Sequence, residues 1–267
     1  MRPRRGADPA PARLPPPPPA LVPGMLSVLA LVGLWSLAAV VTDHPQTLPA
    51  PWAVAGRIAR IAASGELARN GAATLGRVAA SFVLAMAAGV AIGLVMGRNR
   101  RVDAWLTPSL LILLNLPALV LIVLSYVWIG LNETAAVVAI ALNKIPIVAV
   151  MLREGARALR PDLDDMARAF GMGRLARLRH VVLPQLAPHV AAAARTGLSL
   201  IWKIVLVVEF LGRPDGVGFR IHLLFSNFDV EGVLAWALAF VAVMLAIDLG
   251  LLRPWARRAN RWRQDAA

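Results

Sequence analysis

Three cationic side chains lie within otherwise apolar stretches of this 267-residue sequence: Lys144, Arg195 and Lys203. An ionisable group inside a long apolar segment is energetically costly and is therefore a candidate for a functional role. Arg195 and Ser199 are four residues apart, so a helix would place them on one face, with Lys203 at the edge of that face. Cations that converge in this way favour the binding of an anion.

Other polar residues in the same stretches leave alternatives open. Lys144 or Lys203 could pair with Glu209 or Asp248, or extend to an interface, and serve only to hold helices together. We interpret Glu209 as a structural or gating carboxylate near the end of its apolar stretch. Asn115, two residues before a proline, could line a polar pathway or cap a broken helix.

No arrangement of residues in the sequence indicates catalysis. Cysteine is absent, and the four histidines are scattered, which argues against a metal centre. Neither lysine follows a glycine, so no phosphate-binding loop of the nucleotide-hydrolysing type is present. We therefore expect a protein that is not an enzyme, with no metal site and no cofactor bound by this chain.

The composition indicates a membrane protein. Hydrophobic residues make up 58% of the chain and charged residues 16%, whereas soluble domains average about 45–50% and 25%. The mean hydropathy is +0.66. The formal net charge is nevertheless +13. These values argue against a soluble enzyme, a disordered chain and a nucleic-acid-binding arm.

Six apolar runs are long enough to cross a bilayer as helices of about 20 residues. The sequence therefore predicts an all-α membrane protein with six transmembrane helices. The third run contains Pro117 and the fourth contains Pro146, and a proline can kink or break a helix at its position. The predicted spans are 21–41, 78–96, 105–129, 134–152, 185–208 and 233–252.

The distribution of basic residues predicts the orientation. With both termini inside, 19 of the 28 basic residues lie on the inner side and six on the outer side, where Arg77 is counted. The expected organisation is a Pro-rich disordered cytoplasmic tail (1–20), a transmembrane domain (21–252) and a basic cytoplasmic tail (253–267). A cleaved signal peptide at the first run is the alternative.

Two further segments have clear patterns. Segment 51–70 predicts an amphipathic outer helix at the membrane surface. Ala85, Gly89 and Gly93 recur every four residues in the second run, which is typical of close helix packing.

The inner loop 153–184 predicts a short helix. Pro161 suits a first helical turn, and Gly171 can end the helix. Leu163, Met166, Ala167 and Phe170 then share one face. By pattern alone this face could rest on lipid headgroups or dock onto a partner protein.

The same loop resembles the coupling motif of the permease subunits of ABC importers. Asp165-Met166-Ala167, three residues, Gly171, nine residues and then Val181-Val182-Leu183-Pro184 keep the spacing of that motif. Several other segments are similar to the nitrate, sulfonate and taurine branch, among them Gly216-Val217-Gly218-Phe219. The resemblance covers about residues 45–255. It implies that the following residues couple to an ATPase: Leu163, Asp165, Met166, Ala167, Phe170, Gly171, Leu183 and Pro184.

The resemblance also implies the partners and the location. Such a permease lies in the bacterial inner membrane as a homodimer, works with a cytoplasmic ATPase that uses ATP and Mg²⁺, and receives solute from an extracytoplasmic binding protein. It contacts lipid and no nucleic acid. A small anion would cross by alternating access, along a pathway with these candidate residues: Asn115, Lys144, Arg195, Ser199, Lys203 and Glu209. The alternative is a self-sufficient secondary transporter or channel.

Overall fold

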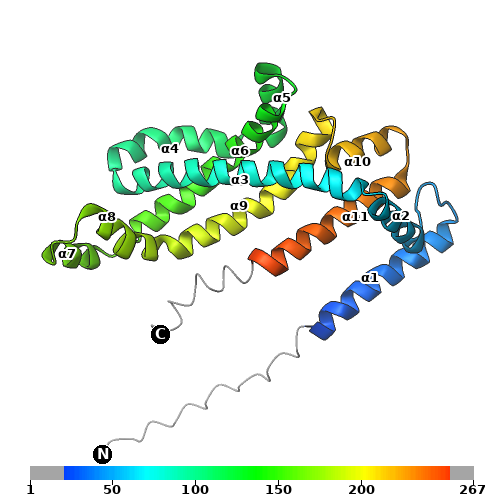
Figure 1. Cartoon of the computed structure of the whole chain (residues 1–267), viewed down its shortest axis with the longest axis horizontal. Helices are drawn as coiled ribbons and strands as arrows, with labels where there is room; N and C mark the ends of the chain where they lie inside the picture. Colours follow the sequence, from blue (N-terminus) through cyan, green and yellow to red (C-terminus); the bar gives the residue numbers. More distant parts are fainter. Residues whose placement is uncertain (1–20, 253–267) are drawn as a thin grey trace, which may run out of the picture. The chain divides into compact units, whose positions relative to one another are not determined.

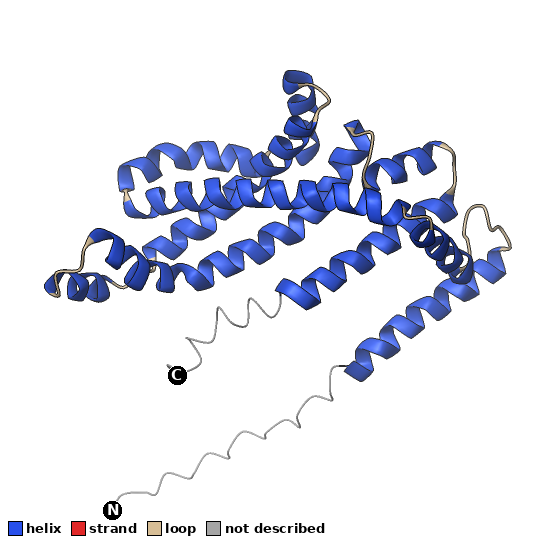
Figure 2. Cartoon of the chain, viewed as in Figure 1, coloured by secondary structure: helices blue, strands red, loops and turns tan. Residues whose placement is uncertain are grey.

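The protein is built from helices. A computed structural model describes residues 21–252, and the described part contains helices joined by short loops and no strand (Figure 2). The two predicted tails, 1–20 and 253–267, lie outside the described residues. The elements, of which Figure 1 labels the α-helices, are α1 (Leu21–Thr42), α2 (Pro51–Ala63), α3 (Glu66–Arg98), α4 (Arg100–Asn115), α5 (Ala118–Ile129), α6 (Glu133–Arg157), α7 (Pro161–Ala169), α8 (Arg174–Arg177), the π-helix η1 (Leu178–Val182), α9 (Leu183–Gly212), α10 (Val217–Ser226), α11 (Val230–Ile247) and the π-helix η2 (Asp248–Leu252).

The chain divides into two compact units, with the division between residues 53 and 54. The first unit contains α1, which is apolar on all sides, as is typical of a helix surrounded by lipid. Within this unit the Trp35 indole Nε1–H donates a hydrogen bond to the Pro49 carbonyl oxygen at 3.1 Å. This bond ties the end of the helix to the segment that follows it.

In the part of the chain that the structure describes, five helical runs are long and apolar enough to cross a membrane: 23–42, 66–98, 133–157, 174–212 and 230–250. The predicted third span is not one straight helix, because α4 and α5 meet at an angle of 98°. The break lies at Leu116, whose backbone is extended, as a residue before a proline prefers. The count is six only if this bent pair forms one span.

Small residues let α3 and α6 approach closely. A Cβ atom added to Gly89 would lie 2.6 Å from the Val148 Cβ, and one added to Gly93 would lie 2.4 Å from the Ala149 carbonyl oxygen. Ala85, one turn earlier, is buried. The predicted packing role of this stripe is confirmed.

Two prolines leave their helices unbroken. Pro146 lies inside α6, and Pro184 lies in the first turn of α9. Leu183-Pro184 forms no turn, because η1 joins α8 to α9, with the Leu183 N–H donating to the Leu178 carbonyl oxygen five residues back. The result is one helical run from Arg174 to Gly212.

The predicted outer helix ends sooner than expected, since α2 stops at Ala63 and α3 begins at Glu66. Its arginines pair with the start of α11: Arg57 contacts Asp229 at 3.1 Å, and Arg60 contacts Glu231 at 3.3 Å. Its polar face therefore binds protein rather than only facing solvent.

Candidate functional site

The loop between α6 and α9 contains a short helix with well-defined ends. Helix α7 begins with Pro161, as the sequence predicts. It ends in a Schellman motif: Gly171, at φ +66°, donates from its N–H to the Arg168 carbonyl oxygen, and Met172 donates to that of Ala167, both at 2.9 Å. A residue with a Cβ would be strained at this φ. Gly171 therefore fixes the direction in which the chain leaves α7.

The apolar face predicted for α7 is divided between protein and surroundings. Ala167 is fully buried and Leu163 half-buried, whereas Met166 is 46% and Phe170 80% exposed. Leu175, in the adjoining α8, is 78% exposed. Asp165, Leu183 and Pro184 are also exposed. The loop thus exposes large apolar side chains, while Ala167 packs α7 against the rest of the protein.

Polar contacts hold the loop against α9. The Arg160 N–H donates to the Gln185 side-chain oxygen at 3.0 Å, and Arg177 contacts Asp164 at 3.0 Å. The Arg160 guanidinium also donates to Asp162, and this bond lowers the pKa of the Asp162 carboxyl. These contacts give the loop one defined conformation.

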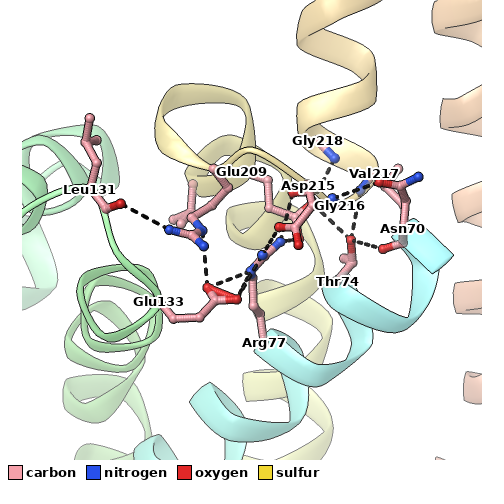
Figure 3. Close-up of polar contacts among 12 residues, drawn as sticks. Asn70, Thr74, Arg77, Leu131, Glu133, Glu209, Asp215, Gly216, Val217 and Gly218 are labelled. Atoms are coloured by element: carbon pink, nitrogen blue, oxygen red, sulfur yellow. Dashed lines mark hydrogen bonds and ion pairs between the residues drawn. The ribbon is translucent and has the colours of Figure 1, made fainter.

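A second polar site lies at the opposite end of α9, and only its member Glu209 was singled out from the sequence. Figure 3 shows Arg77 of α3, 2% exposed, surrounded by three carboxylates. Its Nη1 contacts Glu209 at 2.6 Å, its Nη2 contacts Glu133 at 2.9 Å, and it also pairs with Asp215. The predicted second span began at residue 78, so the position of Arg77 inside α3, which begins at Glu66, is a correction.

Glu209 is the fully buried member of this Arg77 cluster (Figure 3). One carboxylate oxygen accepts from Arg77, and the other accepts from the Thr74 hydroxyl at 3.0 Å and the Gly218 N–H at 2.8 Å. Gly216, at φ +101°, allows the approach, because an added Cβ would lie 2.4 Å from the Glu209 carboxyl carbon. The carboxylate thereby caps the N-terminus of α10, where the helix dipole favours negative charge.

The cluster had a detectable signal in the sequence. Asn70, Thr74, Arg77 and Ser81 recur at helical spacing along α3, and all four are buried. A polar stripe on an apolar helix indicates polar partners elsewhere in the chain. The sequence does not say which carboxylates those partners are. The structure pairs Glu209 with Arg77 rather than with Lys144 or Lys203.

The remaining candidates lie in different environments. Arg195 and Ser199 line one pocket of about 220 Å³ together with residues of α11. Lys203, four residues after Ser199, is exposed, whereas Lys144 is buried in α6. The Asn115 side-chain amide donates to the Leu111 carbonyl oxygen at 2.8 Å, which closes the last turn of α4. The structure therefore brings together only two of the six predicted pathway residues.

The protein has long apolar helices, a polar cluster that joins their ends and a structured loop with an exposed apolar surface. These features define a multi-pass membrane protein. Within residues 21–252 no group of three or more histidine or acidic residues could hold a metal ion. Residues 89–253 match the family described as the inner membrane component of binding-protein-dependent transport systems. The chain belongs to this family of transport permeases of the inner membrane.

Several characterised or provisionally named proteins are similar to the chain over most of its length. The taurine transport system permease protein of Escherichia coli K12 is 27% identical over 90% of this chain and 88% of its own. A Bacillus subtilis 168 protein, provisionally named an aliphatic sulfonates transport permease, is 26% identical over 91% and 88%. The bicarbonate transport system permease protein of Synechococcus elongatus is 27% identical over 70% and 68%.

Proposed function

We propose that the chain is the transmembrane subunit of an ATP-driven importer for a small anion of the sulfonate, taurine or nitrate type. Two copies would form the pathway, an ATPase would bind the inner loop, and a binding protein would deliver solute from the other side. Alternating access would move the solute. Family membership favours this importer over a self-sufficient secondary transporter, because the family works with binding proteins.

The exposed apolar surface of the inner loop carries the proposal. Met166 and Phe170 at the end of α7 and Leu175 of α8 are exposed, whereas Ala167 of α7 is buried and Gly171 fixes the end of that helix. Large apolar side chains exposed on a rigid polar loop mark a site for a protein partner. Ion pairs such as Arg177–Asp164 hold this surface in place before binding. A partner that binds the loop and shifts it would therefore also move α9.

We expect the substitution Phe170→Asp to abolish binding of the ATPase, because a charge would replace a large apolar side chain that is 80% exposed at the proposed contact. The full chain, tagged, would be expressed with the ATPase subunit of the same transport system, and the ATPase purified with it would be quantified. The variant should retain less than about a tenth of the ATPase.

The matched control is Phe170→Leu, which keeps an apolar side chain at the same position. It should retain ATPase binding within about twofold. Thermal unfolding of both variants should match that of the unaltered protein, because the side chain packs against little within the chain. Equal amounts of ATPase with Phe170→Asp and Phe170→Leu would exclude this surface as the contact.

A further inference from the structure

We propose that the pocket between α9 and α11 binds a zwitterionic solute, with an anionic group at Arg195 and an ammonium group at Asp248. The inference rests on the proposed function, since it assigns the class of solute that this permease carries. The pocket has a volume of about 220 Å³ and is lined by Arg195, Ser199, Trp202, Met244, Leu245 and Asp248.

The exposed face of α9 cannot face lipid at low cost. Arg195 and Ser199 are exposed in the single chain, and Arg195 is the thirteenth of the 30 residues of α9. A charged side chain near the middle of a spanning helix is energetically costly when it faces lipid. This face is therefore expected to border water or polar groups, which is the environment a polar solute needs.

The pocket contains groups for both ends of a zwitterion. A guanidinium binds sulfonate or carboxylate oxygens through two parallel hydrogen bonds, and the Ser199 hydroxyl can add a third. The Asp248 carboxylate attracts an ammonium group. A simple anion would satisfy Arg195 but would be repelled by Asp248.

The walls of the pocket are held in place by packing. Trp202 is 3% exposed, and its ring meets that of Phe240 of α11 edge to face, with centroids 5.7 Å apart. Asp248 already takes part in an interaction in the structure. Binding of a zwitterion would replace that interaction with one between the Asp248 carboxylate and the ammonium group.

The size of the pocket also limits the solute. Pockets for drug-sized ligands measure about 300–1,000 Å³, so one of about 220 Å³ suits a molecule of few heavy atoms. The apolar side chains of Met244 and Leu245 form the rest of the wall and would contact a short alkyl chain. An aminoalkanesulfonate such as taurine has an anion, a cation and such a chain.

Labelling of a single cysteine tests the proposal directly, since the natural chain has none. The full-length Ser199→Cys variant in lipid nanodiscs would be treated with N-ethylmaleimide, and the labelling rate measured with taurine, ethanesulfonate or ethylammonium present. Taurine should slow labelling at least about fivefold, and the other two, which each carry one charge, less than about twofold. Val207→Cys, exposed on α9 outside the pocket, is the control and should not be protected.

Second substitutions in the Ser199→Cys background separate the two charges. Asp248→Asn should remove the preference for taurine over ethanesulfonate, and Arg195→Gln should remove protection by both. Labelling too slow to measure, equal protection by taurine and ethanesulfonate, or equal protection of Val207→Cys would overturn the proposal. The assay uses no ATP and no ATPase, so its outcome is independent of the Phe170→Asp experiment.

Discussion

Replacing Arg77 with methionine is expected to destabilise the protein by about 3–5 kcal/mol, because it leaves a buried carboxylate without its counter-charge. Glu209 is fully buried, and within residues 21–252 the Thr74 hydroxyl and the Gly218 N–H would be its only remaining donors. The apparent unfolding temperature of the full chain in detergent, followed by tryptophan fluorescence, should fall by roughly 10 °C.

Two variants identify the buried charge as the cause. Arg69→Met makes the same change at an exposed position of α3 and should shift the unfolding temperature by less than about 2 °C. Adding Glu209→Gln to Arg77→Met removes the uncompensated charge and should restore most of the loss. If the Arg77→Met protein unfolded at the same temperature as the unaltered chain, the Arg77 cluster would contribute no net stability.

The second large effect is expected from Gly93→Ala in the contact between α3 and α6. The added methyl group would lie 2.4 Å from the Ala149 carbonyl oxygen and 2.8 Å from the Leu152 Cβ. The backbone oxygen cannot move without its helix, so the two helices must separate at a cost of about 1–3 kcal/mol. Thermal unfolding measured as for Arg77→Met should show this loss.

Gly76→Ala is the matched comparison, because Gly76 lies on the same helix and an added Cβ would meet nothing within 4 Å. Here the substitution should stabilise the protein by about 0.5–1 kcal/mol, since alanine loses less backbone entropy in a helix. Opposite signs at the two positions would confirm that Gly93 is needed for packing. A destabilising effect of equal size at both would contradict the packing argument.

Features that depend on neighbours in the sequence were predictable. Pro161 and Gly171 act through backbone rules that operate within one turn, so the ends of α7 follow from the sequence. The four-residue repeat of Ala85, Gly89 and Gly93 needs only the helical period to indicate a packing face. The repeat does not indicate which helix packs against this face.

Features that depend on distant residues were not predictable. Arg77 and Glu209 are 132 positions apart, and no local pattern assigns one to the other. The pocket shows the same limit, since helical spacing places Arg195 and Ser199 together but does not indicate that Asp248 forms the opposite wall. The angle at Pro117 also depends on the surroundings: the proline marks a break, and tertiary packing sets its 98° bend.

The unbroken helical run from Arg174 to Gly212 has a mechanical consequence. Its 39 residues form a rod roughly 58 Å long, with Leu175 near one end and Glu209, held by Arg77, near the other. A tilt of about 10° around the fixed end would carry Leu175 through roughly 9 Å but Arg195 through only roughly 4 Å. Under such a tilt the place of each side chain along the rod would set how far it moves, so a large displacement of the loop would become a small displacement beside the pocket.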